Sequence, residues 1–240
     1  MAGFVDLHCH WIPGVDDGAP TLDAGLAILR GLGSLGFVRV VATPHMRPGL
    51  FDNTAAELRA AFADVQGQLS VHTDLPERAL SSEHYFDDVV FHRICAGQGL
   101  PYPGEAAVLL EFYESSFPLR LDQLLAQLRQ RKLTPVVAHP ERYRALWEQP
   151  ETLERLLDQG ALALLDVAAL VGKYGRRPQR CAEEFLERGL YHAACSDAHR
   201  PDDVEQVARG IERLRRLYGQ DEVVALLADG PREILAGGPP

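Results

Sequence analysis

The sequence predicts an α/β fold in which parallel strands alternate with helices, similar to a TIM barrel. Two observations support this fold class. A short apolar segment precedes a helical pattern about seven times, which is the rhythm of an α/β barrel. Side chains of metal-ligand type stand directly after six of these segments. Because parallel barrels build their sites at the C-terminal ends of strands, both observations point to the same architecture.

The expected strands and helices alternate along the whole chain. The expected strands are 4–8, 38–42, one ending near 82–83, 107–110, 135–138, 162–167 and a seventh running into Asp197. The expected helices are 21–35, 54–69, 87–95, 121–131, 151–159, 179–188, 203–217 and 221–228. Leu22, Leu26 and Leu29 lie on one face of the first helix, and Gly36 ends it. The segment 85–104 is the least regular, and we expect a loop around its short helix.

Two motifs at opposite ends of the chain each pair ligand-type residues two positions apart. His8 and His10 follow the first apolar run, and Asp197 and His199 follow the last one. Residues i and i+2 of a strand point to the same side, so each pair aims two ligands at one place. Imidazole and carboxylate groups suit a metal site. The sequence therefore predicts a metal-dependent hydrolase whose first and last strands meet.

The other expected strands end in the same kinds of side chain. The ligand-type residues that directly follow a strand are His8, His45, Glu83, Glu111, His139 and Asp197. In a parallel barrel these positions form a ring at one end. Asp6 and Asp16 are expected to support the ring by orienting its members. His72, His84, His92 and His192 fit no ligand position.

Composition excludes several other classes of protein. The 240 residues carry a formal charge of −10, with 24 Lys and Arg against 34 Asp and Glu. This balance argues against nonspecific binding of nucleic acid or of an anionic membrane surface. No apolar run reaches membrane-spanning length, and the N-terminus lacks a secretory signal, so we expect a cytoplasmic protein. No linker or repeat is apparent, and we expect one domain over residues 1–240.

Cysteine chemistry is excluded as the basis of catalysis. A cysteine phosphatase carries Arg six positions after its nucleophile, at the end of a loop that cradles phosphate. Here the residues six positions after the four cysteines are Val15, Pro101, Glu187 and Pro201. The cysteines also lack the paired spacing of a zinc knuckle or a disulfide framework.

Several motifs together resemble the PHP (polymerase and histidinol phosphatase) superfamily. They are Asp6-x-His8-x-His10, Asp16-Asp17-Gly18, Thr43-Pro44-His45, Ser82-Glu83, His139 and Ser196-Asp197-Ala198-His199. The Asp-Asp-Gly, Leu110-Glu111-Phe112 and Ala138-His139-x-Glu141-Arg142-Tyr143 segments are similar to the bacterial CpsB/CapC-type tyrosine-protein phosphatases in particular. The likeness runs from residue 4 to about 203, with a related ending at 231–235. It implies a distorted (β/α)7 barrel of the PHP type.

The resemblance also implies a centre of three divalent metal ions. One ion would be held by His8, His10, Glu83 and Asp197, and Glu83 would bridge to a second ion. The remaining implied ligands are Glu111 and His139 for the second ion, and Asp17, His45 and His199 for the third. Nitrogen and oxygen ligands without sulfur suit manganese, which we expect first, and also iron, cobalt or zinc. Cys9, where the family commonly has Ser, is expected to point away from the ions.

Phosphomonoester hydrolysis would follow from such a centre. A hydroxide shared by two ions would attack phosphorus in line, while the third ion and arginines hold the other phosphoryl oxygens. Arg142, Arg200 and Arg47 each follow an expected ligand within three residues and could contact phosphate bidentately. A phenolate leaves readily, with a pKa of about 10, so a dedicated general acid is dispensable.

The resemblance implies a protein-tyrosine phosphatase that acts on the tyrosine-rich tail of a polysaccharide-export kinase, and thus on capsule or exopolysaccharide synthesis. Two alternatives remain open from the sequence. One is a small-molecule phosphatase such as histidinol phosphatase, which would need a closed pocket. The other is a metal-binding regulatory module without turnover. The complete set of nine ligand-type residues counts against the last alternative. The sequence does not indicate an oligomeric state.

Overall fold

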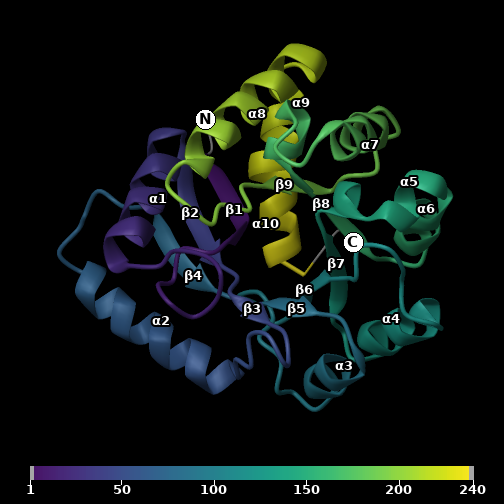
Figure 1. The fold of residues 1–240 in the computed structure, drawn as a ribbon, viewed down its shortest axis with the longest axis horizontal. Helices are drawn as coiled ribbons and strands as arrows, with labels where there is room; N and C mark the ends of the chain where they lie inside the picture. The colour runs from purple at the N-terminus through teal and green to yellow at the C-terminus, as the bar shows by residue number, and fades with distance from the viewer. Residues whose placement is uncertain (1–2, 238–240) are drawn as a thin grey trace.

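Parallel strands in two sheets form the centre of the molecule (Figure 1). The computed structural model describes residues 3–237. The first sheet has the order β1 (Phe4–Cys9), β2 (Phe37–Ala42) and β4 (Glu77–Leu80). The second has the order β3 (His45–Met46), β5 (Glu83–Tyr85), β6 (Ala107–Glu111), β7 (Thr134–Ala138), β8 (Leu162–Asp166) and β9 (Ala193–Cys195). All neighbouring strands within each sheet run parallel. The α/β class and the parallel arrangement are therefore confirmed.

The chain continues from two strands of the first sheet into short strands of the second sheet. The expected strand 38–42 is found as β2, and β3 is an additional strand beyond its expected end. The chain passes from β2 through Thr43 and Pro44 into β3, and from β4 through Ser81 and Ser82 into β5. Pro44 has no N–H to donate, so the ladder is interrupted there. Its carbonyl oxygen instead accepts hydrogen bonds from the Ser82 hydroxyl (2.7 Å) and the Glu83 amide (3.2 Å). Pro44 therefore accounts for the break between β2 and β3.

The first strand and the segment after the last one are hydrogen-bonded to each other. The Asp197 amide donates to the His8 carbonyl at 2.9 Å, and the His10 amide donates to the Ala198 carbonyl at 2.9 Å. Cys9 and Ala198 form a parallel bridge between these hydrogen bonds. The expected meeting of the two ends of the chain is therefore confirmed.

Helices surround the strands on the outside (Figure 1). They are α1 (Leu22–Ser34), α2 (Ala55–Leu69), α3 (Asp88–Cys95), α4 (Leu121–Gln130), α5 (Arg144–Glu148), α6 (Glu151–Asp158), α7 (Arg176–Glu187) and α8 (Asp203–Tyr218). Thr21, Thr54 and Asp87 cap α1, α2 and α3 by accepting amide hydrogen bonds. Helix α7 begins earlier than the expected residue 179 because Pro178 lies in its first turn, where an amide donor is not needed. Two short 3₁₀ segments, η1 (Pro140–Arg142) and η2 (Val167–Val171), follow β7 and β8.

The C-terminal elements η3 (Ala225–Asp229) and α10 (Gly230–Leu235) lie against β1 and β9, near the centre of the molecule (Figure 1). The expected helix 221–228 is divided into α9 (Gln220–Val224) and the π-helical turn η3, which leads into α10. Ile234 of α10 is buried in one apolar cluster with Leu7, Leu109 and Leu164. Gly230 lies so close to the carbonyl oxygen of His192 that a Cβ atom would overlap it. Helix α10 is thus part of the central core.

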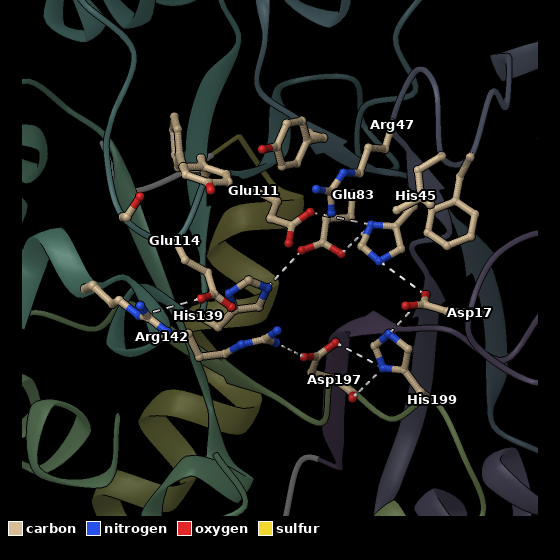
Figure 2. A pocket seen from close by; sticks show the side chains of 17 residues that line it. Asp17, His45, Arg47, Glu83, Glu111, Glu114, His139, Arg142, Asp197 and His199 are labelled. Atoms are coloured by element: carbon tan, nitrogen blue, oxygen red, sulfur yellow. Dashed lines mark hydrogen bonds and ion pairs between the residues drawn. The ribbon is translucent and has the colours of Figure 1, made fainter. Parts of the chain in front are cut away.

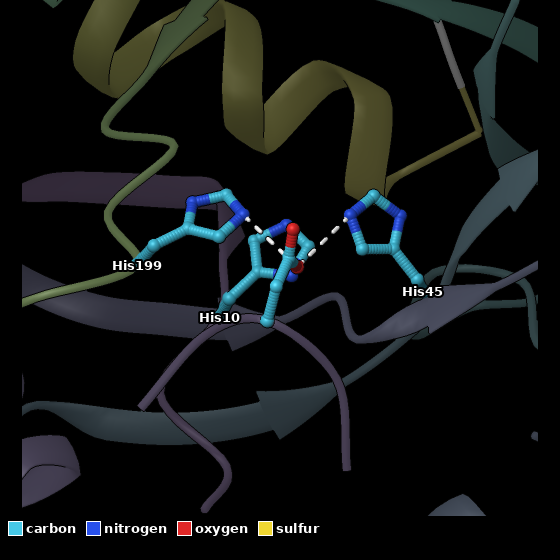
Figure 3. Close-up of side chains that lie close together, drawn as sticks. His10, His45 and His199 are labelled. Carbon is cyan, nitrogen blue, oxygen red and sulfur yellow. Dashed lines mark ion pairs between the residues drawn. The ribbon is translucent and has the colours of Figure 1, made fainter. Parts of the chain in front are cut away.

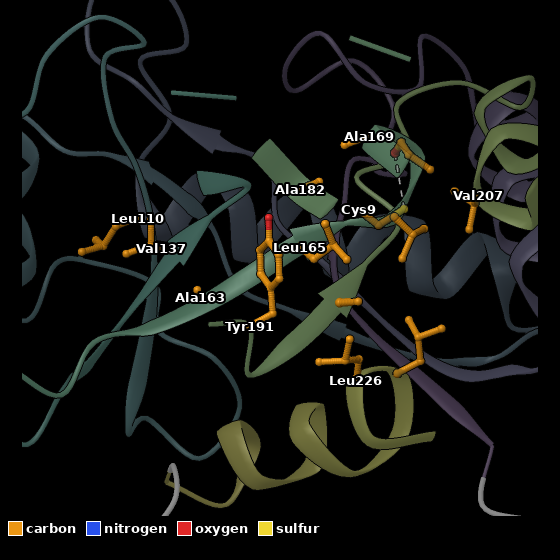
Figure 4. Close-up of a cluster of buried hydrophobic side chains, with 14 of the residues drawn as sticks. Cys9, Leu110, Val137, Ala163, Leu165, Ala169, Ala182, Tyr191, Val207 and Leu226 are labelled. Carbon is orange, nitrogen blue, oxygen red and sulfur yellow. Dashed lines mark hydrogen bonds between the residues drawn. The ribbon is translucent and has the colours of Figure 1, made fainter. Parts of the chain in front are cut away.

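The core has an inner and an outer layer, separated by the strands. Leu109, Val136 and Leu164 belong to the inner cluster. Their neighbours belong to the outer cluster, where Leu110, Val137 and Leu165 lie with side chains such as Tyr191 (Figure 4). This alternation of directions along continuous apolar runs is typical of parallel strands buried on both faces. Within the described residues, no helix has the length and apolar character needed to cross a membrane.

Candidate metal centre

Nine ligand-type side chains converge on one end of the strands. They are His8, His10, Asp17, His45, Glu83, Glu111, His139, Asp197 and His199, and together they fall into four overlapping groups. The ligand-type atoms within each group lie within 4.8 Å of one another. Figure 2 shows side chains of this set facing one another around the pocket. The structure therefore brings together every residue predicted as a metal ligand.

The contacts divide into three groups that follow the three implied ion sites. The first group contains His8, His10, Glu83 and Asp197, and it lies deepest, where β1 meets the turn after β9. The Nε2 atom of His8 is 3.2 Å from Glu83 Oε2, 3.3 Å from Asp197 Oδ1 and 3.1 Å from His10 Nε2. The Nε2 atom of His10 is 3.4 Å from the same Glu83 oxygen and 3.6 Å from Asp197 Oδ1. All four side chains are buried. One small volume is thus lined by two imidazoles and two carboxylates.

The second group also lies around the Glu83 carboxylate. Its Oε1 atom is 2.9 Å from His139 Nε2, while its Oε2 atom is 3.1 Å from His45 Nδ1. Glu111 Oε2 is 3.7 Å from the same His45 nitrogen. Both carboxylate oxygens of Glu83 are therefore in contact with the ring: Oε1 faces His139, and Oε2 faces His45 as well as His8 and His10.

The third group lies nearer the surface. Asp17 Oδ1 is 3.4 Å from His45 Nε2 and 3.6 Å from His199 Nε2. The ring of His10 stacks on the ring of His199 with their centroids 4.0 Å apart (Figure 3). Asp17 is exposed while the histidines are more enclosed, so this group faces the mouth of the pocket.

The spacing and chemistry of these atoms fit divalent ions. Two ligands that each lie about 2.1 Å from one ion are about 2.9–3.4 Å apart in octahedral or tetrahedral geometry. The separations above lie in or near that range. Among the described residues, His45 Nδ1, Glu111 Oε2 and Asp197 Oδ1 are buried without a hydrogen bond. Buried polar atoms normally have a partner, so an ion would satisfy what the protein leaves unpaired.

The carboxylates of the centre differ in their pKa values because their surroundings differ. Burial opposes the ionisation of Asp197, but the charges of His8, His199 and Arg142 outweigh it and hold its pKa below the usual value. Burial, followed by the negative charge of Glu83, raises the pKa of Glu111 to about 7. Burial, followed by the charge of Arg142, lowers the pKa of His139 to about 4, so this imidazole is neutral and can bind a cation.

The backbone is strained at two of the nine positions. His139 has a φ of +33° and Asp197 has a φ of +44°, which is the left-handed region that non-glycine residues rarely adopt. Each residue directly or closely follows a strand, β7 or β9. Such strain persists where surrounding contacts impose it and is concentrated at functional sites. It turns both side chains toward the ring.

Two neighbouring carboxylates, Asp16 and Asp6, hold ligand-type residues of the ring in place, the role expected of them from the sequence. Asp16 Oδ2 is 2.7 Å from His10 Nδ1 and also accepts the His45 amide at 3.0 Å. Asp6 accepts the amides of His8 (3.2 Å) and Ser196 (3.0 Å), which ties β1 to the turn after β9. A histidine whose other nitrogen is held by a carboxylate keeps a fixed tautomer and orientation.

Cys9 lies away from the ring, as expected. Its sulfur packs in the outer apolar cluster and contacts the Ala198 carbonyl oxygen at 3.4 Å (Figure 4). Burial raises the pKa of this thiol well above its usual value. Cys9 is therefore a small core residue rather than a ligand or nucleophile.

His84 has a structural role, although it directly follows Glu83. Its Nε2 atom accepts the Leu100 amide at 3.0 Å, so its Nδ1–H donates to the Leu109 carbonyl at 3.0 Å. Both nitrogens are thereby used by backbone groups. Burial lowers the pKa of His84 to about 4. These contacts agree with the prediction that His84 is not a metal ligand.

Two of the three predicted arginines reach the pocket, which has a volume of about 480 Å³. Arg142 donates to Asp197 at 2.8 Å and lies 4.5 Å above the ring of Tyr174. Arg47 lies 4.0 Å above the ring of Tyr85. Arg200 is exposed and is not among the lining residues. Any contact between Arg200 and phosphate therefore stays a prediction.

Sequence reasoning did not single out several residues beside the ring. Arg144, Tyr85 and Tyr113 line the pocket together with the predicted ligands. Tyr174 places its hydroxyl 3.5 Å from Asp197 Oδ2. Asp166 ends β8 and is buried, which is the strand-end signal that identified the other carboxylates. That signal could have found Asp166, but Tyr174 lies in a loop without one.

The comparisons with known sequences agree with this geometry. The family described as "Capsular polysaccharide synthesis, CpsB/CapC" matches residues 4–236. The chain is 30% identical to the tyrosine-protein phosphatase YwqE of Bacillus subtilis (strain 168) over 196 residues, covering 81% of this chain and 77% of YwqE. It is 24% identical to the tyrosine-protein phosphatase CpsB of Streptococcus pneumoniae over 237 residues, covering 96% of this chain and 98% of CpsB.

Solved structures extend the likeness to three dimensions. A structure from a study of YwqE from Bacillus subtilis and CpsB from Streptococcus pneumoniae, described as "unique metal-dependent tyrosine phosphatases", matches with a TM-score of 0.89 and 26% identity. The match covers 98% of this chain and 95% of that one. The phosphotriesterase homology protein of Escherichia coli shares the fold alone, with a TM-score of 0.59 and 13% identity. Since the family match spans almost every described residue, the chain belongs to the CpsB/CapC family.

Proposed function

We propose that this protein is a metal-dependent phosphatase that hydrolyses phosphotyrosine in proteins. The observation that carries the proposal is the complete ring of nine ligand-type side chains, seven of which line one pocket together with Arg142 and Arg47. Relatives that match along most of the chain are named tyrosine-protein phosphatases. The ring supplies sites for cations, and the arginines supply donors for phosphoryl oxygens.

The nine residues would hold three divalent ions. His8, His10, Glu83 and Asp197 would form one site, Glu83, Glu111 and His139 a second, and Asp17, His45 and His199 a third. Bound ions of this kind supply Lewis acidity and a water with a lowered pKa. The donor atoms are imidazole nitrogen and carboxylate oxygen without sulfur, which suits manganese and also iron, cobalt or zinc. Asp16 would keep the His10 imidazole in the tautomer that presents Nε2 to the centre.

The pocket arginines would bind and orient the phosphoryl group. Arg142 is held by Asp197 and by the face of Tyr174, so its guanidinium is fixed before substrate arrives. A donor that needs no reorganisation stabilises developing negative charge most effectively. Arg47 would act from the opposite side, where the ring of Tyr85 holds it. The phenolate formed from phosphotyrosine has a pKa of about 10 and leaves without a dedicated acid.

We further propose that the strands close a distorted (β/α)7 barrel in one domain. β3 continues β2 and β5 continues β4, so the two sheets reduce to seven strand positions. The hydrogen bonds between the ends of the chain support closure beside β1. In such a barrel the ring lies at the C-terminal ends of the strands, the usual place of the active site.

The physiological substrate that fits this family is the tyrosine-phosphorylated tail of a kinase in polysaccharide export. The family description, which concerns capsular polysaccharide synthesis, supports this assignment. The pocket also opens to the surface beside exposed side chains such as Tyr113 and Glu114. An open rim admits a phosphorylated polypeptide, whereas a single metabolite is usually enclosed.

The test compares hydrolysis of a phosphotyrosine peptide with hydrolysis of histidinol phosphate. Each assay is run with added manganese, with a chelator and with vanadate. We expect turnover of the peptide that the chelator abolishes and vanadate inhibits. His139→Ala should abolish turnover, whereas His72→Ala, outside the pocket, should match the wild type. A preference for histidinol phosphate would move the protein to small-molecule metabolism, and no turnover with metals bound would leave a binding module.

A further inference from the structure

A second concavity, which we name the side groove, lies directly beside the metal-centre pocket. It has a volume of about 760 Å³. One wall comes from the β5–α3 connection and α3, and the other from the β6–α4 loop and α4. The residues that define its floor and walls in the argument below are Phe86, Phe91, Phe117, Leu119 and Leu124.

The side groove is continuous with the pocket. Tyr85 and Tyr113 line both of them. Tyr85 is paired with Glu111 between β5 and β6, and the Phe86 amide donates to the Glu111 carbonyl at 2.7 Å. The groove therefore begins where the two strands that carry Glu83 and Glu111 end. A molecule that leaves the pocket over Tyr85 or Tyr113 enters the groove.

The walls of the side groove are apolar and firmly supported. Phe86 and Phe91 are buried and pack edge-to-face, with ring centroids 5.6 Å apart. Phe117 packs edge-to-face on Phe112 at 5.2 Å, which anchors the β6–α4 loop to the core. On this loop Leu119 is 92% exposed. Tyr113, which is 59% exposed, lines the same groove, so two large apolar side chains are left in water there. Exposed apolar patches with a polar rim mark interaction sites.

Charged and ionisable side chains line both walls of the side groove. Asp87, Asp88 and His92 lie on the α3 side and Arg120 on the α4 side. Asp88, His92 and Arg120 are exposed, whereas Asp87, which caps α3, is half-buried. An apolar centre with a polar rim is the usual anatomy of a site that binds polypeptide. Because both signs of charge are present at the rim, the apolar centre and not net charge would select the ligand.

We propose that the side groove binds the substrate polypeptide next to its phosphotyrosine and accepts one large apolar side chain. This inference rests on the proposed function, because a phosphorylated protein continues on both sides of its phosphotyrosine and its chain must leave the pocket. The shared residues Tyr85 and Tyr113 give it a path into the groove. Peptide substrates therefore gain binding that free phosphotyrosine cannot reach.

The test uses Leu119→Asp, assayed with an apolar-flanked phosphotyrosine peptide, free phosphotyrosine and p-nitrophenyl phosphate. Leu119 is exposed and lies outside the metal-centre pocket, so folding and chemistry should not change. We expect kcat/KM for the peptide to fall about tenfold, which corresponds to the lost burial of one large apolar side chain. Turnover of the two small substrates should stay at the wild-type value, and Leu119→Met should retain most of the peptide activity.

Val71→Asp is the matched control, because Val71 is 77% exposed and lines neither concavity. Alanine substitution along the peptide should identify one flanking position whose loss lowers kcat/KM for the wild type but not for Leu119→Asp. Equal peptide turnover by wild type and Leu119→Asp would overturn the inference, as would a parallel loss for small substrates. If the wild type hydrolyses no phosphotyrosine compound at all, it is the proposed function that fails.

Discussion

The guanidinium of Arg142 is bound at 2.8 Å to Asp197, a buried carboxylate that is also part of the ligand ring. The same guanidinium stacks on Tyr174. One carboxylate thus serves two parts of the pocket, since Oδ1 faces His8 while Oδ2 binds Arg142. The arginine that would hold phosphate is therefore positioned by a residue that would hold metal.

Replacement of Arg142 should lower kcat/KM strongly without unfolding the protein. For Arg142→Ala we expect a loss of about 10²–10³-fold for phosphotyrosine peptides, as for other preorganised charge-stabilising donors. Arg142→Lys should recover little, because an ammonium cannot contact a carboxylate and a phosphoryl group in the same planar fork. Steady-state kinetics with p-nitrophenyl phosphate and peptide check this, and Arg216→Ala, an exposed arginine of α8 outside the pocket, is the control. Full activity in Arg142→Lys would contradict a bidentate role.

Tyr174 should act through its ring rather than its hydroxyl. Tyr174→Phe keeps the aromatic face under Arg142 and should change kcat/KM by less than about threefold, because the 3.5 Å hydroxyl contact to Asp197 is long. Tyr174→Leu removes the stacking, which is worth about 1 kcal/mol, and should raise KM several-fold. Measuring kcat and KM separately for both variants distinguishes the two. Equal losses in both would assign the effect to the hydroxyl.

Removal of metal should lower stability as well as activity. Ions that bind only the native state stabilise it in proportion to the logarithm of their concentration over the dissociation constant. We therefore expect manganese to raise the melting temperature of the chelator-treated protein by several degrees. The increase should be smaller in His139→Ala, because the ion proposed to lie between Glu83, Glu111 and His139 would lose one ligand. Calorimetry measures this directly, and an unchanged melting temperature would mean that the ring binds no ion.

His84 should make stability depend on pH. Burial lowers its pKa to about 4, against 6.5 in the unfolded chain. Below pH 6.5 the unfolded chain binds a proton that the folded protein does not, so the free energy of unfolding falls as the pH falls toward 4. Between pH 7 and pH 5 this loss amounts to about 2 kcal/mol. The measurement is urea unfolding in the presence of chelator at pH 7 and pH 5. The free energy of unfolding should fall by about 2 kcal/mol less in His84→Gln than in the wild type. Identical pH profiles for both proteins would contradict it.

Gly230 should tolerate no side chain. A Cβ atom there would overlap the His192 carbonyl oxygen, so Gly230→Ala should force α10 to shift and cost about 2 kcal/mol. Gly67→Ala is the matched control, because Gly67 is exposed in α2 and a Cβ atom would meet nothing within 4 Å. That change should stabilise the helix by up to about 1 kcal/mol. Denaturant unfolding compares the two variants, and equal stabilities would show that α10 is not closely docked.

The ligand ring could be predicted from the sequence because it depends on local rules. Residues two apart on a strand share a side, and parallel strands end at one edge, so His8, His10 and Asp197 had to converge. The positions of two predicted arginines have different causes. His199 faces the ring, and Arg200, its immediate neighbour, is exposed on the surface instead. Arg142 is turned inward by the left-handed His139 and the η1 turn after it, which no periodicity indicated.

The side groove could not be predicted, because it depends on contacts distant in sequence. The β6–α4 loop has no regular hydrophobic pattern, and its position is fixed by Phe117 packing on Phe112 and Tyr143. The break between β2 and β3 has a local cause in Pro44. Which sheet β2 and β3 each join depends instead on the strands beside them. Tertiary packing, rather than propensity, decides such features.

The hydrogen bond between the Asp197 amide and the His8 carbonyl joins residues from opposite ends of the chain. During synthesis, the ribosome releases His8 and His10 long before their partners exist. A nascent chain therefore carries an open half of the ring, and the centre forms only after the last strand and α10 have emerged. Contacts of such long sequence separation slow folding. Metal binding by the complete ring would therefore follow the synthesis of the last strand, and chains truncated before that strand would carry no assembled centre.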